Sequence, residues 1–67
     1  MDARDYLKRG REYFDKENYS QANADFWKAM ELTHESYEVA ILREKSKVFA
    51  PAVVAEFLRS TLNQILG

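Results

Sequence analysis

The 67-residue chain contains only two glycines and one proline, and its apolar residues recur three, four and seven positions apart. Apolar residues at this spacing lie on one face of an α-helix, because about 3.6 residues make one helical turn. With so few residues that interrupt helices, the pattern predicts an all-α fold. We expect a small bundle of three or four helices that forms a single domain over residues 1–67.

Pro51 marks the clearest helix boundary in the chain. Proline fits the first turn of a helix and pushes the preceding residue out of helical geometry. We therefore expect one helix to end near Phe49 and a C-terminal helix to cover residues 51–66. This helix is more apolar than a helix at the edge of a monomer needs. Its predicted stripe consists of Val54, Phe57, Leu58, Thr61, Leu62 and Ile65, with Val53, Ala55 and Leu66 off it.

Two further helices are predicted in the first half of the chain. Asp2 can cap the first of them, which runs from Ala3 to about Lys16, because its carboxylate can accept hydrogen bonds from the first turn. A short turn over residues 16–20 follows, where Asn18 and Ser20 are both competent caps for the second helix. Gly10 interrupts the first helix at a cost of about 1 kcal/mol relative to alanine. A glycine at this position indicates close approach of another helix.

The segment between the second helix and Pro51 has two possible structures. Residues 33–36 contain mostly mediocre helix formers, and Ser36 is able to cap a new helix. However, no glycine or proline stands here, and the apolar stripe continues through Tyr37, Ala40, Ile41 and Val48 without a phase break. Residues 37–49 therefore form either a third helix or a continuation of the second, which would then be one helix over about residues 20–48.

Seven aromatic or small residues in the first half of the chain share the spacing of a known helical repeat: Tyr6, Gly10, Tyr13, Tyr19, Ala22, Phe26 and Ala29. Residues 3–36 thus resemble one unit of the tetratricopeptide repeat, a pair of antiparallel helices. The resemblance implies that the two helices pack closely where Gly10 and Ala22 are small. Arg9, Glu12 and His34 depart from the repeat pattern, and no second repeat follows. The peptide-binding role of the family is therefore not transferred to this chain.

A second resemblance covers part of the same hairpin. The segment from Gln21 to Ala29 is similar to small helical-bundle proteins related to the HEPN superfamily. Catalytic members of that superfamily carry an arginine four to six residues before a histidine. Lys28 occupies the corresponding place before His34, so a nuclease activity is disfavoured. Both resemblances predict a tight antiparallel hairpin.

The small size of the chain limits how it can become stable. A domain of about 60 residues buries only about 60% of its unfolded surface, and it is marginal without additional support. Disulfides are excluded because the chain has no cysteine, and a single histidine argues against structural zinc. Good helix packing or self-association must therefore provide the stability.

Charge and hydropathy limit the possible partners and locations. The net charge of −1 gives no overall attraction to nucleic acid or to an acidic membrane. The longest apolar stretch, near Phe49–Ala55, is too short to span a bilayer. The N-terminus lacks the apolar core of a secretion signal. We therefore expect no membrane partner and a cytoplasmic location.

These features predict a non-catalytic protein–protein interaction or scaffold module that self-associates through apolar helix faces. The expected partner is another protein or a second copy of the chain in a homodimer. For Trp27 the sequence leaves two places open: in the interface with a partner, or packed under the C-terminal helix of the same chain. Six residues are the interface candidates: Trp27, Met30, Phe57, Leu58, Leu62 and Ile65. The alternative function is a small nucleic-acid-associated regulator that uses a basic face of the first helix, formed by Arg4, Lys8 and Arg11.

No catalytic, cofactor-binding or metal-binding site is predicted. The chain has no glycine-rich phosphate loop and no cysteine nucleophile. The only histidine, His34, would need a partner for acid–base catalysis, and three glutamates lie within one helical turn of it. These glutamates are Glu31, Glu35 and Glu38. The simpler interpretation is that His34 is an ordinary histidine at the end of a helix.

Overall fold

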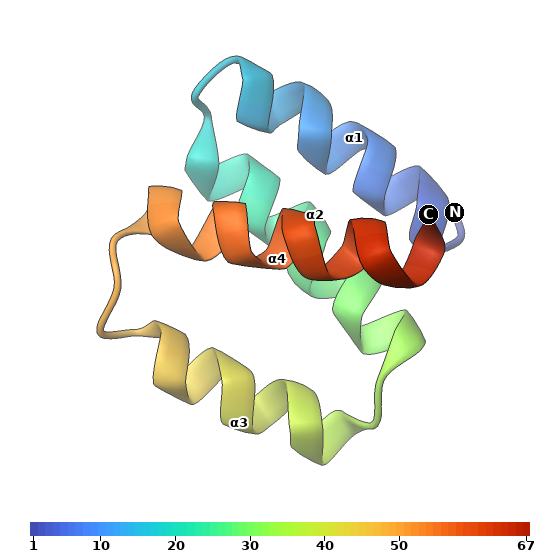
Figure 1. Cartoon of the computed structure of the whole chain (residues 1–67), viewed down its shortest axis with the longest axis vertical. Helices are drawn as coiled ribbons and strands as arrows, with labels where there is room; N and C mark the ends of the chain where they lie inside the picture. The colour runs from blue at the N-terminus through green and yellow to red at the C-terminus, as the bar shows by residue number, and fades with distance from the viewer.

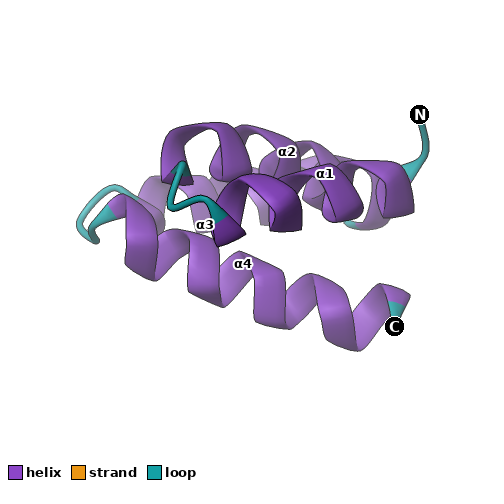
Figure 2. Cartoon of the chain, turned by 90° about the horizontal axis from the view of Figure 1, so that it is seen from above, coloured by secondary structure: helices purple, strands orange, loops and turns teal.

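The computed structural model describes residues 1–67 and contains four helices and no strands. These are α1 (Ala3–Asp15), α2 (Tyr19–Thr33), α3 (Ser36–Ser46) and α4 (Pro51–Leu66). Helices α1 and α2 form an antiparallel hairpin, α4 crosses α2, and α3 lies at the edge of the bundle (Figure 1). Figure 2 shows α4 as a separate layer against the hairpin. The predicted all-α fold and the antiparallel hairpin are thus confirmed.

Both predicted N-terminal caps of the hairpin are present. The Asp2 carboxylate accepts from the backbone N–H of Asp5 at 3.0 Å, and the Asp5 carboxylate accepts from the backbone N–H of Asp2 at 3.1 Å. This reciprocal pair satisfies two donors at the start of α1. At the start of α2, the Asn18 side chain accepts from the backbone N–H of Gln21 at 3.4 Å. Asn18 therefore caps α2, whereas Ser20, the other competent cap, lies within the helix.

Helix α1 ends in a left-handed turn at Glu17, whose φ is 61°. The N–H groups of Glu17 and Asn18 donate to the carbonyls of Phe14 and Tyr13, both at 2.9 Å. This is the Schellman arrangement, in which the left-handed position is usually glycine. The sequence predicts the turn, but the glutamate gives no sign of the positive φ.

The close approach expected at Gly10 is present. A Cβ atom at this position would lie 2.6 Å from Phe26 Cε1 and 3.3 Å from the carbonyl oxygen of Ala22. Real side chains do not approach so closely, so the position requires glycine unless Phe26 moves. Both Ala22 and Phe26 are completely buried. The spacing of Gly10, Ala22 and Phe26 therefore reports the contact between α1 and α2.

A break at residues 34 and 35 separates α2 from α3, so a single helix over residues 20–48 is wrong. His34 has φ −131° and ψ 163°, and Glu35 has φ −71° and ψ 146°, which are extended conformations. Ser36 is the first residue of α3 and not its cap; the cap position belongs to Glu35, which makes no side-chain capping bond. The break lets the chain turn away from α2, and it leaves α3 without a side-chain cap at its start.

Helix α3 is also shorter than predicted, because it ends at Ser46 rather than near Phe49. The Ser46 hydroxyl donates to the carbonyl of Arg43 at 2.7 Å, and the N–H of Phe49 donates to the carbonyl of Ser46 at 3.0 Å. These local bonds satisfy groups that would otherwise continue the helix. Four residues, 47–50, then connect α3 to Pro51.

The buried face of α4 is rotated relative to the predicted stripe. Val54, Leu58 and Leu62 are buried as expected, but Ala55, predicted to lie off the stripe, is completely buried as well. Phe57 and Ile65, predicted to be on the stripe, are about half exposed. The reason is that α4 packs mainly against α2, so the side of α4 that includes the small Ala55 faces the core. The opposite edge of the apolar stripe remains uncovered.

Candidate interaction surface

Four of the six interface residues predicted from the sequence lie in the core of the chain. Met30, Leu58 and Leu62 are completely buried, and Trp27 is 8% exposed. Their burial inside a single chain leaves almost no surface for a partner. Trp27 is therefore a core residue, and its ring lies against the guanidinium group of Arg43 on α3. Phe57 and Ile65 are the two predicted interface residues that remain accessible, at 51% and 47% exposure.

An apolar groove lies between α3 and α4, with Phe57 on one of its walls. Its volume is about 310 Å³, and five of its seven lining residues are hydrophobic. The groove exists because α3 packs against α2 and makes little contact with α4. We call this surface the α3–α4 groove. Its lining residues are Leu42, Lys45, Ser46, Phe49, Val53, Val54 and Phe57.

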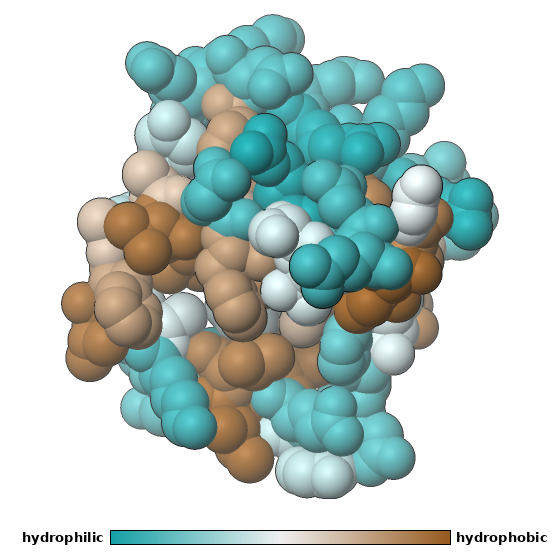
Figure 3. All heavy atoms as spheres, viewed as in Figure 1, coloured by the Kyte–Doolittle hydropathy of each residue, from teal (hydrophilic) through white to brown (hydrophobic).

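The rim of the α3–α4 groove carries large apolar side chains in solvent. Phe49 and Val53 are 58% and 53% exposed. Tyr37 and Ile41 are also exposed, and they precede the lining residue Lys45 at intervals of four, which places all three along one side of α3. Figure 3 shows hydrophobic atoms gathered over the start of α4 and the connection from α3. The apolar surface thus extends along both helices.

The predicted basic face of α1 is accessible, but it is not concentrated. Arg4, Lys8 and Arg11 are all exposed on α1. Arg11 donates through Nη1 to Oδ1 of Asn63 on α4 at 3.0 Å. Arg4 and Lys8 form none of the five ion pairs of the chain. The structure therefore leaves two unpaired cations one turn apart, with a third oriented towards α4.

A charged pair that the sequence does not reveal joins α1 to α2. Arg9 donates through Nε to Asp25 Oδ2 at 2.9 Å and through Nη2 to Asp25 Oδ1 at 2.8 Å. Asp25 is buried, whereas Arg9 is about half exposed. The hydrogen bonds and the charge of Asp25 raise the pKa of Arg9, which stays protonated at all relevant pH values. The pair fixes the register of the hairpin, and only the unusual arginine at position 9 hinted at it.

His34 stands at the end of α2 without an acidic partner. Its Nδ1 lies 2.9 Å from Thr33 Oγ1, and the Thr33 hydroxyl donates to the carbonyl of Ala29 at 3.0 Å. None of the side-chain hydrogen bonds joins the imidazole to Glu31, Glu35 or Glu38. The structure holds no group of three or more His, Cys, Asp or Glu side chains able to bind a metal ion. His34 is therefore part of the helix terminus.

The fold defines a small all-α domain of four helices. No protein-family model, curated protein or solved structure matches the chain. The likeness to the tetratricopeptide repeat consequently rests on the residues of the hairpin alone. None of the four helices is long and apolar enough to cross a membrane.

Proposed function

We propose that the protein is a non-catalytic interaction or scaffold module that associates with a second copy of itself through the α3–α4 groove. The observation that carries the proposal is the groove together with the half-exposed side chains of Phe49, Val53 and Phe57. Monomers rarely expose contiguous apolar surface of this kind without a binding role. Three of these positions are aromatic or β-branched, which suits a rigid interface.

A second copy fits this surface because the surface carries both a hollow and projecting side chains. In a twofold dimer each groove receives side chains from the same face of the other copy, so one patch must complement itself. The antiparallel pair α3 and α4 would meet its counterpart as two halves of a four-helix arrangement. Lys45 is the only charged residue that lines the groove, so few charges would have to be desolvated.

The exposed apolar side chains supply a large part of the area that a dimer needs. Large aromatic side chains have roughly 150–250 Å² of surface, so a half-exposed side chain offers roughly 100 Å². Six exposed apolar side chains lie on this face; the three aromatic ones would present on the order of 300 Å², and the three aliphatic ones add less each, against the roughly 800 Å² that each partner contributes to a standard interface. Burial of this area would also support a domain whose small size limits its core. The six residues are Tyr37, Ile41, Val48, Phe49, Val53 and Phe57.

We propose that the α1–α2 hairpin serves as the scaffold of this module and is a tetratricopeptide-like unit. The fit of Gly10 against Phe26 and Ala22 supports this assignment. In place of a second repeat, α4 packs across the hairpin, mainly against α2. This packing fixes one wall of the α3–α4 groove on a rigid support.

Sedimentation equilibrium of two matched variants tests the function. Phe57 and Leu32 are equally exposed, at 51%, but Leu32 lies outside the α3–α4 groove. We expect the wild-type chain to dimerise, Phe57→Asp to weaken the dimer at least about tenfold, and Leu32→Asp to leave it unchanged. A wild-type chain that stays monomeric at millimolar concentration contradicts the proposal, as does a dimer that both variants weaken equally.

The alternative function, contact with nucleic acid through the basic face of α1, has one observation in its favour. Arg4 and Lys8 are exposed and form no ion pair. Such contacts weaken steeply as the salt concentration rises, because binding releases counterions from the phosphate backbone. Fluorescence anisotropy with a labelled oligonucleotide at low salt decides the matter: binding lost in an Arg4→Gln, Lys8→Gln variant supports this function, and no binding at low salt removes it.

A further inference from the structure

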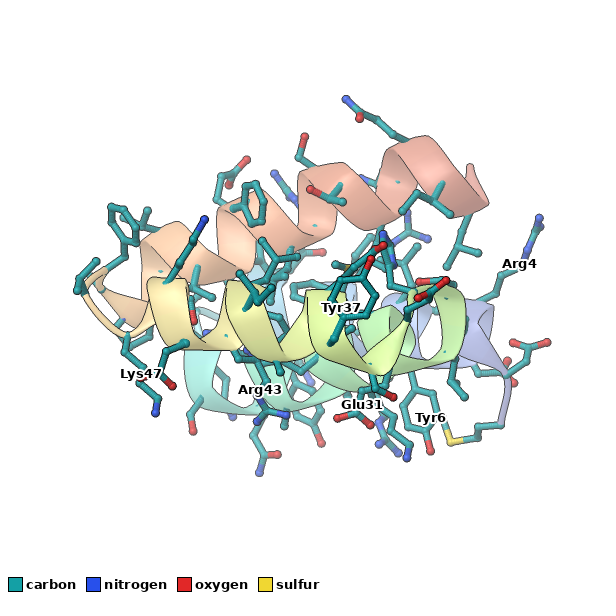
Figure 4. All side chains as sticks on the ribbon, turned by 90° about the horizontal axis from the view of Figure 1, so that it is seen from below. Arg4, Tyr6, Glu31, Tyr37, Arg43 and Lys47 are labelled. Carbon is teal, nitrogen blue, oxygen red and sulfur yellow. The ribbon has the colours of Figure 1, made fainter.

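Arg43 lies on the side of α3 that faces α2, away from the α3–α4 groove. Its Nη1 lies 3.3 Å from Glu31 Oε1 on α2, and its guanidinium carbon lies 5.3 Å from the centre of the Trp27 ring. Figure 4 shows Arg43 and Glu31 on the same side of α3, with Tyr37 projecting on the other side. One side chain of α3 therefore contacts both an aromatic ring and a carboxylate of α2.

Few other contacts hold α3 in place. Val39 is its only buried residue, and Leu42 is partly buried against the core. The ion pair of Lys47 with Glu44 lies within the C-terminal end of α3 and does not reach α2. The N-terminal cap residue, Glu35, makes no side-chain bond. The position of α3 thus depends strongly on the contacts of Arg43.

The position of α3 decides the shape of the α3–α4 groove. Leu42, Lys45 and Ser46 form the wall that α3 supplies, while Val53, Val54 and Phe57 form the wall that α4 supplies. Val54 is buried in the core, so the α4 wall is anchored. None of the three α3 residues that line the groove is buried, and a shift of α3 would widen or close the groove.

We propose that Arg43 is the positioning residue of the groove, which it sets by holding α3 against Trp27 and Glu31. The effect of Arg43 on binding in the groove rests on the proposed function, whereas its effect on the position of α3 does not. A partner in the groove contacts a face of α3 that does not include Arg43. The groove has its complete shape only in molecules whose α3 is docked on α2, and its apparent affinity falls with the fraction of such molecules. Docking of α3 and binding in the groove therefore favour each other.

Amide hydrogen exchange at low concentration, where the chain is monomeric, tests the structural part. We expect Arg43→Gln to speed the exchange of α3 amides about fivefold, because it removes a cation–π contact and an ion pair. Amides of α1 should not change. Arg43→Lys should give an intermediate effect, since it keeps the charge but loses the planar group that stacks on Trp27. The control is Lys47→Gln, which removes an ion pair confined to α3.

Sedimentation equilibrium of the same variants tests the consequence for binding. Arg43→Gln should raise the dissociation constant of the dimer by at most about 25-fold. The substitution makes docking of α3 about fivefold less favourable in each chain, and a dimer requires docked α3 in both chains. Lys47→Gln should leave the constant unchanged.

The two experiments distinguish three outcomes: no role of Arg43 in holding α3, no coupling between α3 and the groove, and no dimer. Equal exchange rates of α3 in Arg43→Gln and Lys47→Gln would overturn the role of Arg43, whatever the oligomeric state. Faster exchange in Arg43→Gln with an unchanged dissociation constant would overturn the coupling to the groove. A wild-type chain that never dimerises refutes the proposed function and the coupling with it, while the exchange data still decide whether Arg43 holds α3.

Discussion

Helices α3 and α4 follow each other in the chain, yet they are held in different ways. Helix α4 buries four residues and contacts both α1 and α2, whereas α3 buries one residue and contacts mainly α2. Both helices also keep large apolar side chains in solvent. Helices α1, α2 and α4 supply ten of the eleven buried hydrophobic residues of the core, and α3 supplies only Val39. The exposed side chains of α3 add little to the fold and are free to bind a partner.

The largest effect on the free energy of unfolding is expected for truncation of a leucine in α4, and truncation of a leucine in α3 is the comparison. Leu58 of α4 is completely buried, and Leu42 of α3 is partly buried. Leu58→Ala should lower the free energy of unfolding by about 2–5 kcal/mol, as expected for a cavity in a packed core. Leu42→Ala should cost about 1 kcal/mol or less, because less apolar surface is lost from the core. Urea denaturation measures both values, and equal losses would show that α3 belongs to the core.

A smaller effect is expected at the contact within the hairpin. Gly10→Ala places a methyl group within 2.7 Å of two ring carbons of Phe26. Overpacking costs about 1–3 kcal/mol, against a gain of about 1 kcal/mol in helix propensity. We therefore expect a net loss of about 1 kcal/mol in the free energy of unfolding. Phe26→Leu in the same background should reduce the cost of the alanine, which a double-mutant cycle would measure. Two strictly additive substitutions would contradict the contact.

The last expected effect is similar in size to that at Gly10 but opposite in sign, a gain in stability at the end of α1. Glu17 has φ 61°, which glycine adopts without the steric cost that a side chain imposes. Glu17→Gly should raise the free energy of unfolding by about 1 kcal/mol, or the melting temperature by about 4–8 °C. The neighbouring substitution Lys16→Gly is the control, because Lys16 has φ −91° and should gain nothing. A lower melting temperature for Glu17→Gly would contradict the Schellman arrangement.

Residue spacing predicted the local structure well because the relevant contacts are local or involve small residues. Gly10, Ala22 and Phe26 encode the hairpin contact, and Pro51 encodes the start of α4. The break at residues 34 and 35 was left open by the sequence, because it contains neither glycine nor proline. It was settled by the extended backbone of these two residues.

The candidate site was less predictable, because an apolar stripe does not say which neighbour covers it. Leu58 and Phe57 belong to the same predicted stripe, yet α2 covers only Leu58. The groove also depends on the weak contact between α3 and α4, which no pattern within one helix encodes. The partner of Arg9 escaped prediction for a similar reason, since Asp25 lies 16 positions away on the opposite helix.

The most direct test of the proposed interface is a series of amide NMR spectra of the wild-type chain from low micromolar to millimolar concentration. Self-association through the α3–α4 groove should shift signals from the exposed side of α3, from Phe49 in the connection and from the start of α4. Signals from the middle of α1 should stay in place, because this helix lies outside the groove. Spectra that do not change with concentration, or shifts confined to α1, would contradict the account.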